Sequence, residues 1–302
     1  MIRALIYCNA EKNLSMKIIA AVRSKEKAQG LFAKELSDGA PLSFIEGTVE
    51  DLNINNIAWE IDYIIHMASQ TSSKAFVEKP VEVINTSIFG TINMLNLAKA
   101  KNAKGLLYLS SMEVYGNPET DELIKENHGT NLDVLSPQTC YPESKRMCES
   151  ICCTYCSEYD VPAKIIRLTQ TFGPGVTYND SRVFAEFARC AIEKRDIVLH
   201  TKGETKRMYL YTADAVKAIL TVLLKGESGQ AYNAANKETY CSIYEMAQLV
   251  AKECAEEAKQ LRDQLLELCE IEEGNTILRL KGSAPADENI RQGVAKTGIF
   301  LY

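Results

Sequence analysis

The sequence predicts an α/β fold in which helices cover both faces of a parallel β-sheet. Between residues 17 and 168, short apolar segments alternate with segments whose apolar residues recur at helical spacing. The apolar segments are continuous, as in GLLYL at residues 105–109, which is typical of strands buried on both faces. Beyond residue 168 this alternation loosens, so we expect a smaller α/β lobe formed by the C-terminal part of the 302-residue chain.

Each element is expected from its own pattern. Strands are predicted at residues 17–22, 42–45, 63–66, 105–109, 163–168 and 230–235. Helices are predicted at residues 25–36, 80–100, 143–159, 183–194 and 213–224, and residues 242–269 should form one long helix or two. Residues 1–168 should form the first domain, with residues 209–236 returning to it. Residues 169–302 should form mainly the second lobe, with a divergent tail after residue 280.

The start of the sequence departs from the usual order of a doubly wound domain that binds a dinucleotide. Such a domain opens with a strand, a glycine-rich turn and a helix whose N-terminus receives the pyrophosphate. Here residues 1–8 have the pattern of the end of a helix, and the first clear strand is KIIAAV at residues 17–22. A first strand and its glycine loop are therefore missing from the expected sheet, which predicts weak binding of NAD(P) and reduced stability.

Composition excludes several classes of partner. The net charge of −6 disfavours nucleic acid and anionic membranes. No run of 18 apolar residues and no signal peptide is present, so we expect a cytoplasmic protein. Of the ten cysteines, Cys148, Cys152 and Cys156 share one helix face. We interpret them as small buried hydrophobic residues in a reducing compartment, and we expect no metal site.

Tyr141 and Lys145 are the first candidate catalytic residues. Their spacing in YPESK places them one turn apart on the same face of a helix. A free phenol has a pKa near ~10, and a neighbouring ammonium should lower it. The pair could then move a proton to or from a hydroxyl group. This spacing also recurs by chance on solvated helix faces.

Ser111 is the third candidate. It follows the apolar strand GLLYL, and polar residues at the carboxyl end of a buried parallel strand point into the ligand crevice. A serine there can hydrogen-bond the reacting oxygen and exchange protons with the tyrosine. The alternative is a simple turn after the strand, which serine also favours.

Taken together, SSMEVYG and YPESK resemble the signature of the NAD(P)-dependent epimerase/dehydratase family of extended short-chain dehydrogenases/reductases. The resemblance extends to HMAS at residues 66–69, FGT at 89–91, RLTQTFGPG at 167–175 and KRMYLYTAD at 206–214. It implies a Rossmann-like fold, a nucleotide-sugar substrate and the cofactor NADP or NAD. Ser111, Tyr141 and Lys145 would be catalytic, and Tyr141 and Lys145 would also contact the cofactor.

The resemblance implies further contacts. Cofactor contacts would come from Asp51 and Leu52 beside the adenine, from the turn of His66, Met67, Ala68 and Ser69, and from Ser87, which stands where many relatives have asparagine. Substrate contacts would come from Glu113, from Gln170 and from Arg207, whose guanidinium suits a diphosphate. Arg207 could instead form a surface salt bridge.

The choice of reaction depends on the residues after Ser111. In 4,6-dehydratases an Asp-Glu pair follows, but here Met112 cannot donate a proton, which disfavours dehydration. Glu113 resembles the glutamate of UDP-glucuronate decarboxylases, although it could be an exposed loop carboxylate. We expect epimerisation first, in cell-surface polysaccharide biosynthesis, with decarboxylation or ketone reduction as alternatives. A degenerate, non-catalytic NAD(P)-binding regulator is the rival from another class.

Two expectations concern the cofactor and association. Arg23 follows the strand at residues 17–22, where NAD-preferring enzymes usually place an acid for the ribose hydroxyl, so it favours NADP through its 2′-phosphate. NAD remains open because epimerases that recycle their cofactor usually keep NAD. The helices at residues 80–100 and 143–159 resemble the pair that forms a homodimer contact in the family, although their apolar stripes could face only the sheet.

Overall fold

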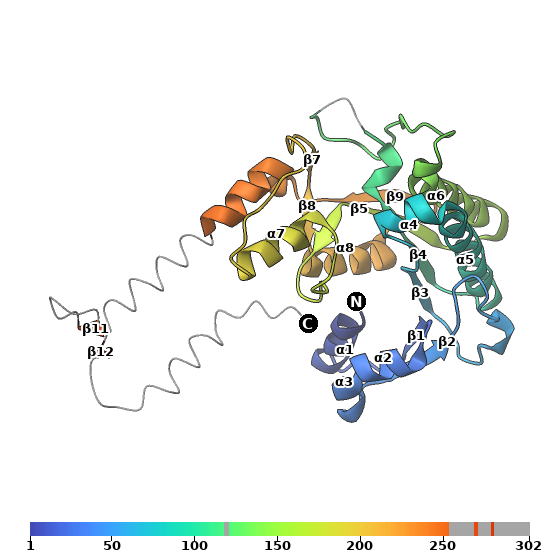
Figure 1. The fold of residues 1–302 in the computed structure, drawn as a ribbon. Helices are drawn as coiled ribbons and strands as arrows, with labels where there is room; N and C mark the ends of the chain where they lie inside the picture. Colours follow the sequence, from blue (N-terminus) through green and yellow to red (C-terminus); the bar gives the residue numbers. More distant parts are fainter. Residues whose placement is uncertain (118–120, 254–268, 271–278, 281–302) are drawn as a thin grey trace. The chain divides into compact units, whose positions relative to one another are not determined.

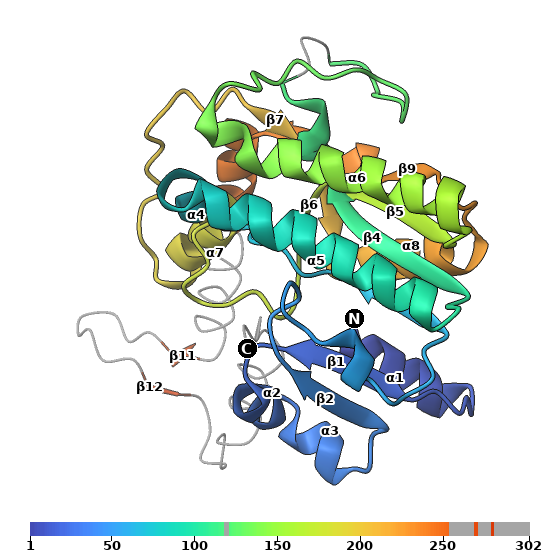
Figure 2. The same cartoon turned by 90° about the vertical axis from the view of Figure 1, so that its right-hand side faces the viewer.

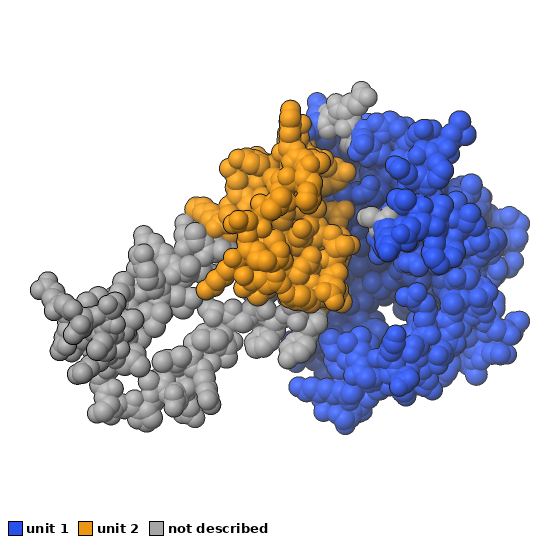
Figure 3. All heavy atoms as spheres, in the orientation of Figure 1, with its two compact units in different colours: residues 1–169, 213–235 blue, residues 170–212, 236–302 orange. Residues whose placement is uncertain are grey.

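A computed structural model describes residues 1–117, 121–253, 269–270 and 279–280 of the chain. It divides into two compact units (Figure 3). Unit 1 comprises residues 1–169 and 213–235, and unit 2 comprises residues 170–212 and 236–302. The chain therefore leaves unit 1 after the fifth strand and returns to it for one helix and one strand.

The main sheet of unit 1 is parallel throughout. Its strands are β3 (Tyr63–His66), β4 (Gly105–Ser111), β5 (Ala163–Leu168) and β9 (Ala231–Ala234), in the order β3-β4-β5-β9. Helices α5 (Pro80–Ala100) and α6 (Cys140–Tyr159) pack side by side on one face, and α8 (Thr212–Lys225) lies on the other (Figure 2). The predicted doubly wound parallel sheet is confirmed.

Burial of apolar strands and helix faces forms the core of unit 1. Leu106 of β4 and Ile165 of β5 are almost completely buried, as is Leu95 of α5. Cys148 and Cys152 of α6 have no exposed surface and belong to the same cluster, so they act as small hydrophobic residues. The eight cysteines within residues 1–253 are all free, and no group of metal-binding side chains occurs among the described residues.

A second, two-stranded parallel sheet carries the N-terminal elements of unit 1. Strand β1 (Ile18–Val22) pairs with β2 (Leu42–Glu46), and α1 (Ile2–Glu11), α2 (Lys25–Leu31) and α3 (Ala33–Ser37) accompany them (Figure 1). The prediction of one helix at residues 25–36 is wrong. Phe32 interrupts it with a non-helical backbone because its ring packs with Ile18 and Leu42 in a small core.

Short helices connect the longer elements. They are η1 (Ile54–Asn56), α4 (Ser73–Glu78), η2 (Met112–Tyr115), η3 (Pro137–Thr139) and η4 (Lys237–Thr239). Helix α6 begins at Cys140, three residues earlier than expected, so Tyr141 and Pro142 lie in its first turn, where a proline costs no hydrogen bond. In the described residues, no helix is both long and apolar enough to cross a lipid bilayer.

Among its described residues, unit 2 contains helix α7 (Val183–Ile192) and small strand pairs. Strand β6 (Gln170–Phe172) pairs in parallel with β8 (Tyr209–Tyr211), and β7 (Lys206–Arg207) pairs antiparallel with β10 (Cys241–Ser242). Phe184 and Phe187 of α7 pack with Tyr209 in its core. After β10, a helix covers residues 243–253.

The bounds expected for the helical segment at residues 242–269 are wrong at both ends, because both terminal residues lie in strands. Ser242 pairs in β10, and Cys269 begins β11 (Cys269–Glu270), which pairs antiparallel with β12 (Arg279–Leu280). The part of the expected helix at residues 254–268, and the tail expected after residue 280, lie outside the described residues.

Candidate functional site

The candidate catalytic residues meet where β4 ends and α6 begins. Ser111 is the last residue of β4, and Tyr141 and Lys145 lie one turn apart near the start of α6. Helix α6 packs directly against β4 and β5, which brings these two segments together although they are 30 residues apart in the sequence. The carboxyl ends of parallel strands are the usual ligand-binding edge of such a sheet.

Tyr141 is buried, with 9% of its surface exposed, and its ring stacks on Phe76 at a centroid distance of 4.7 Å. Burial raises the pKa of its phenol, a hydrogen bond with Ser111 counteracts that rise, and the carboxylate of Glu113 adds to it. The expected lowering of this pKa by Lys145 is therefore wrong for the protein by itself, because removal of the phenol from water outweighs the favourable contacts.

The buried side chain of Lys145 reaches from α6 to strand β4. Its Nζ donates a hydrogen bond of 2.7 Å to the carbonyl oxygen of Leu109 and lies 4.7 Å from the ring centroid of Tyr108. Burial lowers the pKa of Lys145 to about 8. A lysine with this pKa can give up and regain a proton near neutral pH, whereas an exposed lysine cannot.

His66, expected in a turn beside the cofactor, is the buried last residue of β3, and the turn follows it. It is 3% exposed, and its Nε2 lies 3.2 Å from Oγ1 of Thr91. Because the Thr91 hydroxyl donates its own proton to the carbonyl of Ser87, we infer that it accepts one from Nε2–H. Burial lowers the pKa of His66 to about 3, so the ring is neutral near neutral pH.

The residues that follow His66 are more accessible. Met67 and Ala68 are exposed, and Ser69 is half-buried, so this turn can contact a ligand at the carboxyl end of β3. Ser87 on α5 is different: it is 1% exposed, and its hydroxyl has no hydrogen-bond partner in the described part of the chain. A buried hydroxyl without a hydrogen-bond partner costs free energy. A ligand that supplied the missing hydrogen bond to Ser87 would remove that cost.

The other cofactor candidates lie near the second sheet. Arg23 is exposed immediately after β1, and Asp51 is exposed with its carboxylate accepting a hydrogen bond from the Thr48 hydroxyl. Leu52 is 9% exposed and packs in the main core, so it offers little surface to a ligand.

The substrate candidates divide between the two units. Glu113 lies in η2 of unit 1, half-buried, and its backbone N–H donates to the hydroxyl of Ser111 at 3.3 Å. Gln170 lies in β6 and Arg207 in β7, both in unit 2 and half-buried. One guanidinium nitrogen of Arg207 donates to the carbonyl of the preceding residue, Lys206, at 2.9 Å.

Several residues of the site escape prediction from the sequence. Phe76 stacks on Tyr141, and Tyr108 lies under Lys145, yet each stands in a segment that indicates only core or helix. Thr91 holds His66, and the FGT motif at residues 89–91 was its only signal. Gly116, which ends the VYG motif, has φ +70°, and a Cβ there would clash with Oδ1 of Asn131, so glycine is required.

Comparisons with known proteins find similar sequences and similar structures. The family model described as "NAD dependent epimerase/dehydratase family" matches residues 7–235. The chain is 34% identical over 191 residues to UDP-glucuronic acid decarboxylase 1 of Xenopus tropicalis and 32% identical over 191 residues to that of Danio rerio. These alignments cover 63% of this chain but only 44% and 45% of the two relatives, so the chain spans less than half of their length.

Solved structures share the fold. UDP-glucose 4-epimerase of Thermotoga maritima superposes with a TM-score of 0.71 at 20% identity, covering 84% of this chain and 80% of that one. UDP-glucuronic acid 4-epimerase of Bacillus cereus gives a TM-score of 0.69 at 19% identity, covering 83% and 79%. Since the family model covers most of the chain, the protein belongs to the NAD-dependent epimerase/dehydratase family.

Proposed function

We propose that this protein modifies a nucleotide sugar by transient, NAD(P)-linked oxidation of a hydroxyl-bearing sugar carbon. The observation that carries the proposal is the meeting of Ser111, Tyr141 and Lys145 at the carboxyl end of β4 in a member of this family. The relatives support the substrate class, because they are named for UDP-glucuronic acid or UDP-glucose.

The residues at this edge of the sheet fit the nicotinamide-ribose half of the cofactor. Among the described residues, the Lys145 ammonium has one recorded hydrogen-bond acceptor, the carbonyl of Leu109, which leaves protons for ribose hydroxyls. Ser87 adds a buried hydroxyl in need of a partner. When bound, the nicotinamide would accept a hydride from the sugar carbon and later return it.

The protein groups handle the proton. Tyr141 takes the proton from the sugar hydroxyl while hydrogen-bonded to Ser111, and it returns the proton when the carbonyl is reduced. Lys145, with a pKa of about 8, stabilises the phenolate and exchanges protons with the surroundings. Phe76, stacked on the phenol, keeps its ring oriented.

Epimerisation is the first candidate outcome. It needs only that the intermediate ketone be reduced from the opposite face, and it asks nothing of Met112, whose thioether cannot act as the acid of a 4,6-dehydration. Decarboxylation is the second candidate, favoured by Glu113 and by the curated relatives. A ketone β to a carboxylate loses CO₂ readily, so the same oxidation step would serve both reactions.

UDP-glucuronate with NAD distinguishes these outcomes in one experiment. Epimerisation gives an acid of unchanged mass that differs at one carbon, whereas decarboxylation releases CO₂ and gives a UDP-pentose. Chromatography with mass detection separates the products. Binding of NAD without conversion of this or other UDP-sugars would favour the rival, a non-catalytic NAD(P)-binding protein.

The choice between NAD and NADP depends on Arg23. Its exposed guanidinium at the end of β1 suits a 2′-phosphate, whereas the family description names NAD. If Arg23 reads that phosphate, Arg23→Ala should weaken NADP binding by about 1.5–3 kcal/mol, the usual loss for a charge-assisted hydrogen bond, and leave NAD binding unchanged. Equal effects on both cofactors in a fluorescence titration would show that Arg23 does not select the cofactor.

We also propose that the protein forms a homodimer through α5 and α6. Ile84 of α5 and Met147 of α6 are 37% and 52% exposed, and Ile88 and Ile151 continue these two stripes half-buried. Two adjacent helices with exposed apolar stripes suit a self-complementary four-helix contact. In the cell we expect the enzyme to be cytoplasmic and to supply cell-surface polysaccharide synthesis, which a deletion strain with altered polysaccharide would support.

A further inference from the structure

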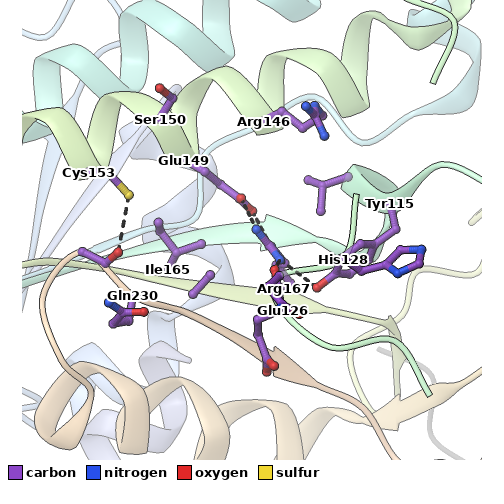
Figure 4. A pocket seen from close by; sticks show the side chains of 14 residues that line it. Tyr115, Glu126, His128, Arg146, Glu149, Ser150, Cys153, Ile165, Arg167 and Gln230 are labelled. Carbon is purple, nitrogen blue, oxygen red and sulfur yellow. Dashed lines mark hydrogen bonds and ion pairs between the residues drawn. The ribbon is translucent and has the colours of Figure 1, made fainter. Parts of the chain in front are cut away.

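A buried carboxylate, Glu149, joins the two segments that carry the candidate catalytic groups. It is 8% exposed and lies one turn beyond Lys145 on α6. Its Oε1 accepts a hydrogen bond of 2.5 Å from the hydroxyl of Ser110 on β4. Both of its oxygens accept from Arg167 of β5, at 2.9 Å and 2.6 Å, as Figure 4 shows.

Arg167 extends this network to the segment after β4. Its Nη1 donates to the hydroxyl of Tyr115, the last residue of η2, and to the carbonyl of Glu126, each at 2.7 Å. The Tyr115 hydroxyl in turn donates to Oδ1 of Asn233 on β9 at 2.7 Å. One network therefore connects β4, η2, β5, β9 and α6.

The placement of this network points to a role in the reaction. A buried ion pair rarely stabilises a fold more than apolar residues of the same size would, so its presence asks for another reason. Ser110 directly precedes Ser111, and Glu149 lies one and two turns from Lys145 and Tyr141 on the same helix face. Of the two residues that Glu149 contacts, Ser110 adjoins Ser111 in sequence, and Arg167 lies opposite Ser110 in the register of β4 and β5.

We propose that Glu149 is a positioning residue, which holds the end of β4 in register with the first turns of α6. Through Arg167 it also holds η2, which carries Glu113. The inference rests on the proposed function, because it assigns the network to the proton-transfer site at this edge of the sheet. The pair lies at the wall of a surface hollow of about 450 Å³, where Arg167 and Glu149 keep 12% and 11% of their side chains exposed.

Glu149 also acts on the charge of Lys145. The groups around that ammonium are His66 from β3, Tyr108 from β4, and Tyr141, Cys148, Glu149 and Cys152 from α6. The histidine is neutral, and burial raises the pKa of both thiols, so they too are neutral near pH 8. Of these groups, Glu149 is therefore the anion that opposes the lowering of the Lys145 pKa by burial.

Three variants separate the effect of the length of the Glu149 side chain from the effect of its charge. Glu149→Gln keeps the size of the side chain but removes the charge, and Glu149→Asp keeps the charge but shortens the reach. Ser110→Ala leaves the ion pair intact and removes only its link to β4, so it stays informative if a change at Glu149 prevents folding. Glu158→Gln, the same substitution at an exposed position of α6, is the matched control.

A positioning role predicts a specific kinetic pattern among folded variants. Ser110→Ala and Glu149→Asp should lower kcat on the order of 10-fold to 100-fold with little change in KM, because small displacements of reacting groups are costly. Glu149→Gln should do the same and also move the alkaline limb of the pH profile to lower pH. A wild-type kcat in both Ser110→Ala and Glu149→Asp would overturn the proposal.

A readout that needs no turnover separates this inference from the proposed function. In protein labelled with ¹³C at the lysine Cε, the Lys145 signal, identified by its loss in Lys145→Arg, should titrate at lower pH in Glu149→Gln than in the wild type. In Glu158→Gln, the Lys145 signal should titrate at the same pH as in the wild type. An unchanged Lys145 titration in folded Glu149→Gln overturns the inference, whereas absence of turnover with intact titration shifts refutes only the proposed function.

Discussion

Burial sets the acid-base properties of the residues at the candidate site more strongly than their charged neighbours do. It raises the pKa of Tyr141 and lowers that of Lys145 to about 8, so both groups are neutralised more easily than in water. In the protein by itself the phenol is therefore protonated near neutral pH. A positively charged nicotinamide beside it would favour the phenolate at the moment when a base is needed.

The role of Tyr141 can be tested with a substitution that keeps the ring. Tyr141→Phe preserves the stacking on Phe76 but removes the proton carrier, so turnover should fall roughly 10²–10⁴-fold. Binding of the cofactor, followed by fluorescence, should change little and serves as the control for folding. Near-normal turnover in this variant would refute the assigned role.

His66 should make the protein sensitive to acid. Its pKa is about 3 in the folded protein and 6.5 unfolded, so between these pH values the unfolded chain binds a proton that the folded protein does not. The His66 contribution to stability is thus present above pH 6.5 and is lost as the pH falls, by about 1.4 kcal/mol per pH unit. His66→Gln should lack this part of the loss in urea unfolding measured from pH 7 to pH 4. Parallel curves for the two proteins would contradict the account.

The sequence indicates which residues are candidates for catalysis, but it does not predict the environment that surrounds them in the fold. The four-residue spacing of Tyr141 and Lys145, and the position of Ser111 after an apolar strand, are local patterns that the fold preserves. The direction of the Tyr141 pKa shift was not predictable, because it depends on desolvation by residues such as Phe76 that are distant in sequence. The burial of His66 and its bond to Thr91 were hidden for the same reason.

At the scale of elements, helices α5 and α6 each have two apolar faces. Their inner faces cover the main sheet, and their outer faces present the apolar stripes that we propose for the homodimer. Ile84→Lys combined with Met147→Lys should convert the dimer to a monomer, because two charges would have to be buried in a contact without partners. Light scattering at micromolar concentration measures the change.

The control for this prediction is another exposed apolar residue. Leu224 of α8 is 61% exposed, so Leu224→Lys should leave the mass of the assembly unchanged. A wild-type protein that is monomeric at the same concentration would reject the proposed contact.

Elements were predicted well where one local pattern dominates. Strands β3, β4 and β5 are continuous apolar segments buried in the main sheet, and the structure places them at or within two residues of the expected bounds. The break at Phe32 was missed because helical spacing continues through it, and only packing against Ile18 and Leu42 reveals it. Strands β7 and β10 have two residues each, too few for a periodic pattern.

At the scale of the whole molecule, each segment of the chain belongs to the unit whose strands and helices it contacts. Residues 213–235 join unit 1 because α8 and β9 complete the main sheet, with β9 paired to β5. Gln170 and Arg207, in contrast, belong to unit 2. The proposed oxidation chemistry is assigned to Ser111, Tyr141 and Lys145, which all belong to unit 1.

The most direct test of the central claim follows the hydrogen at the oxidised sugar carbon. With NAD and UDP-glucuronate that carries deuterium at C4, transient hydride transfer predicts slower turnover than with the unlabelled sugar and a product that retains deuterium at C4. This result is expected for both epimerisation and decarboxylation, because each returns the same hydride. A product whose C4 deuterium has exchanged with solvent would contradict the account.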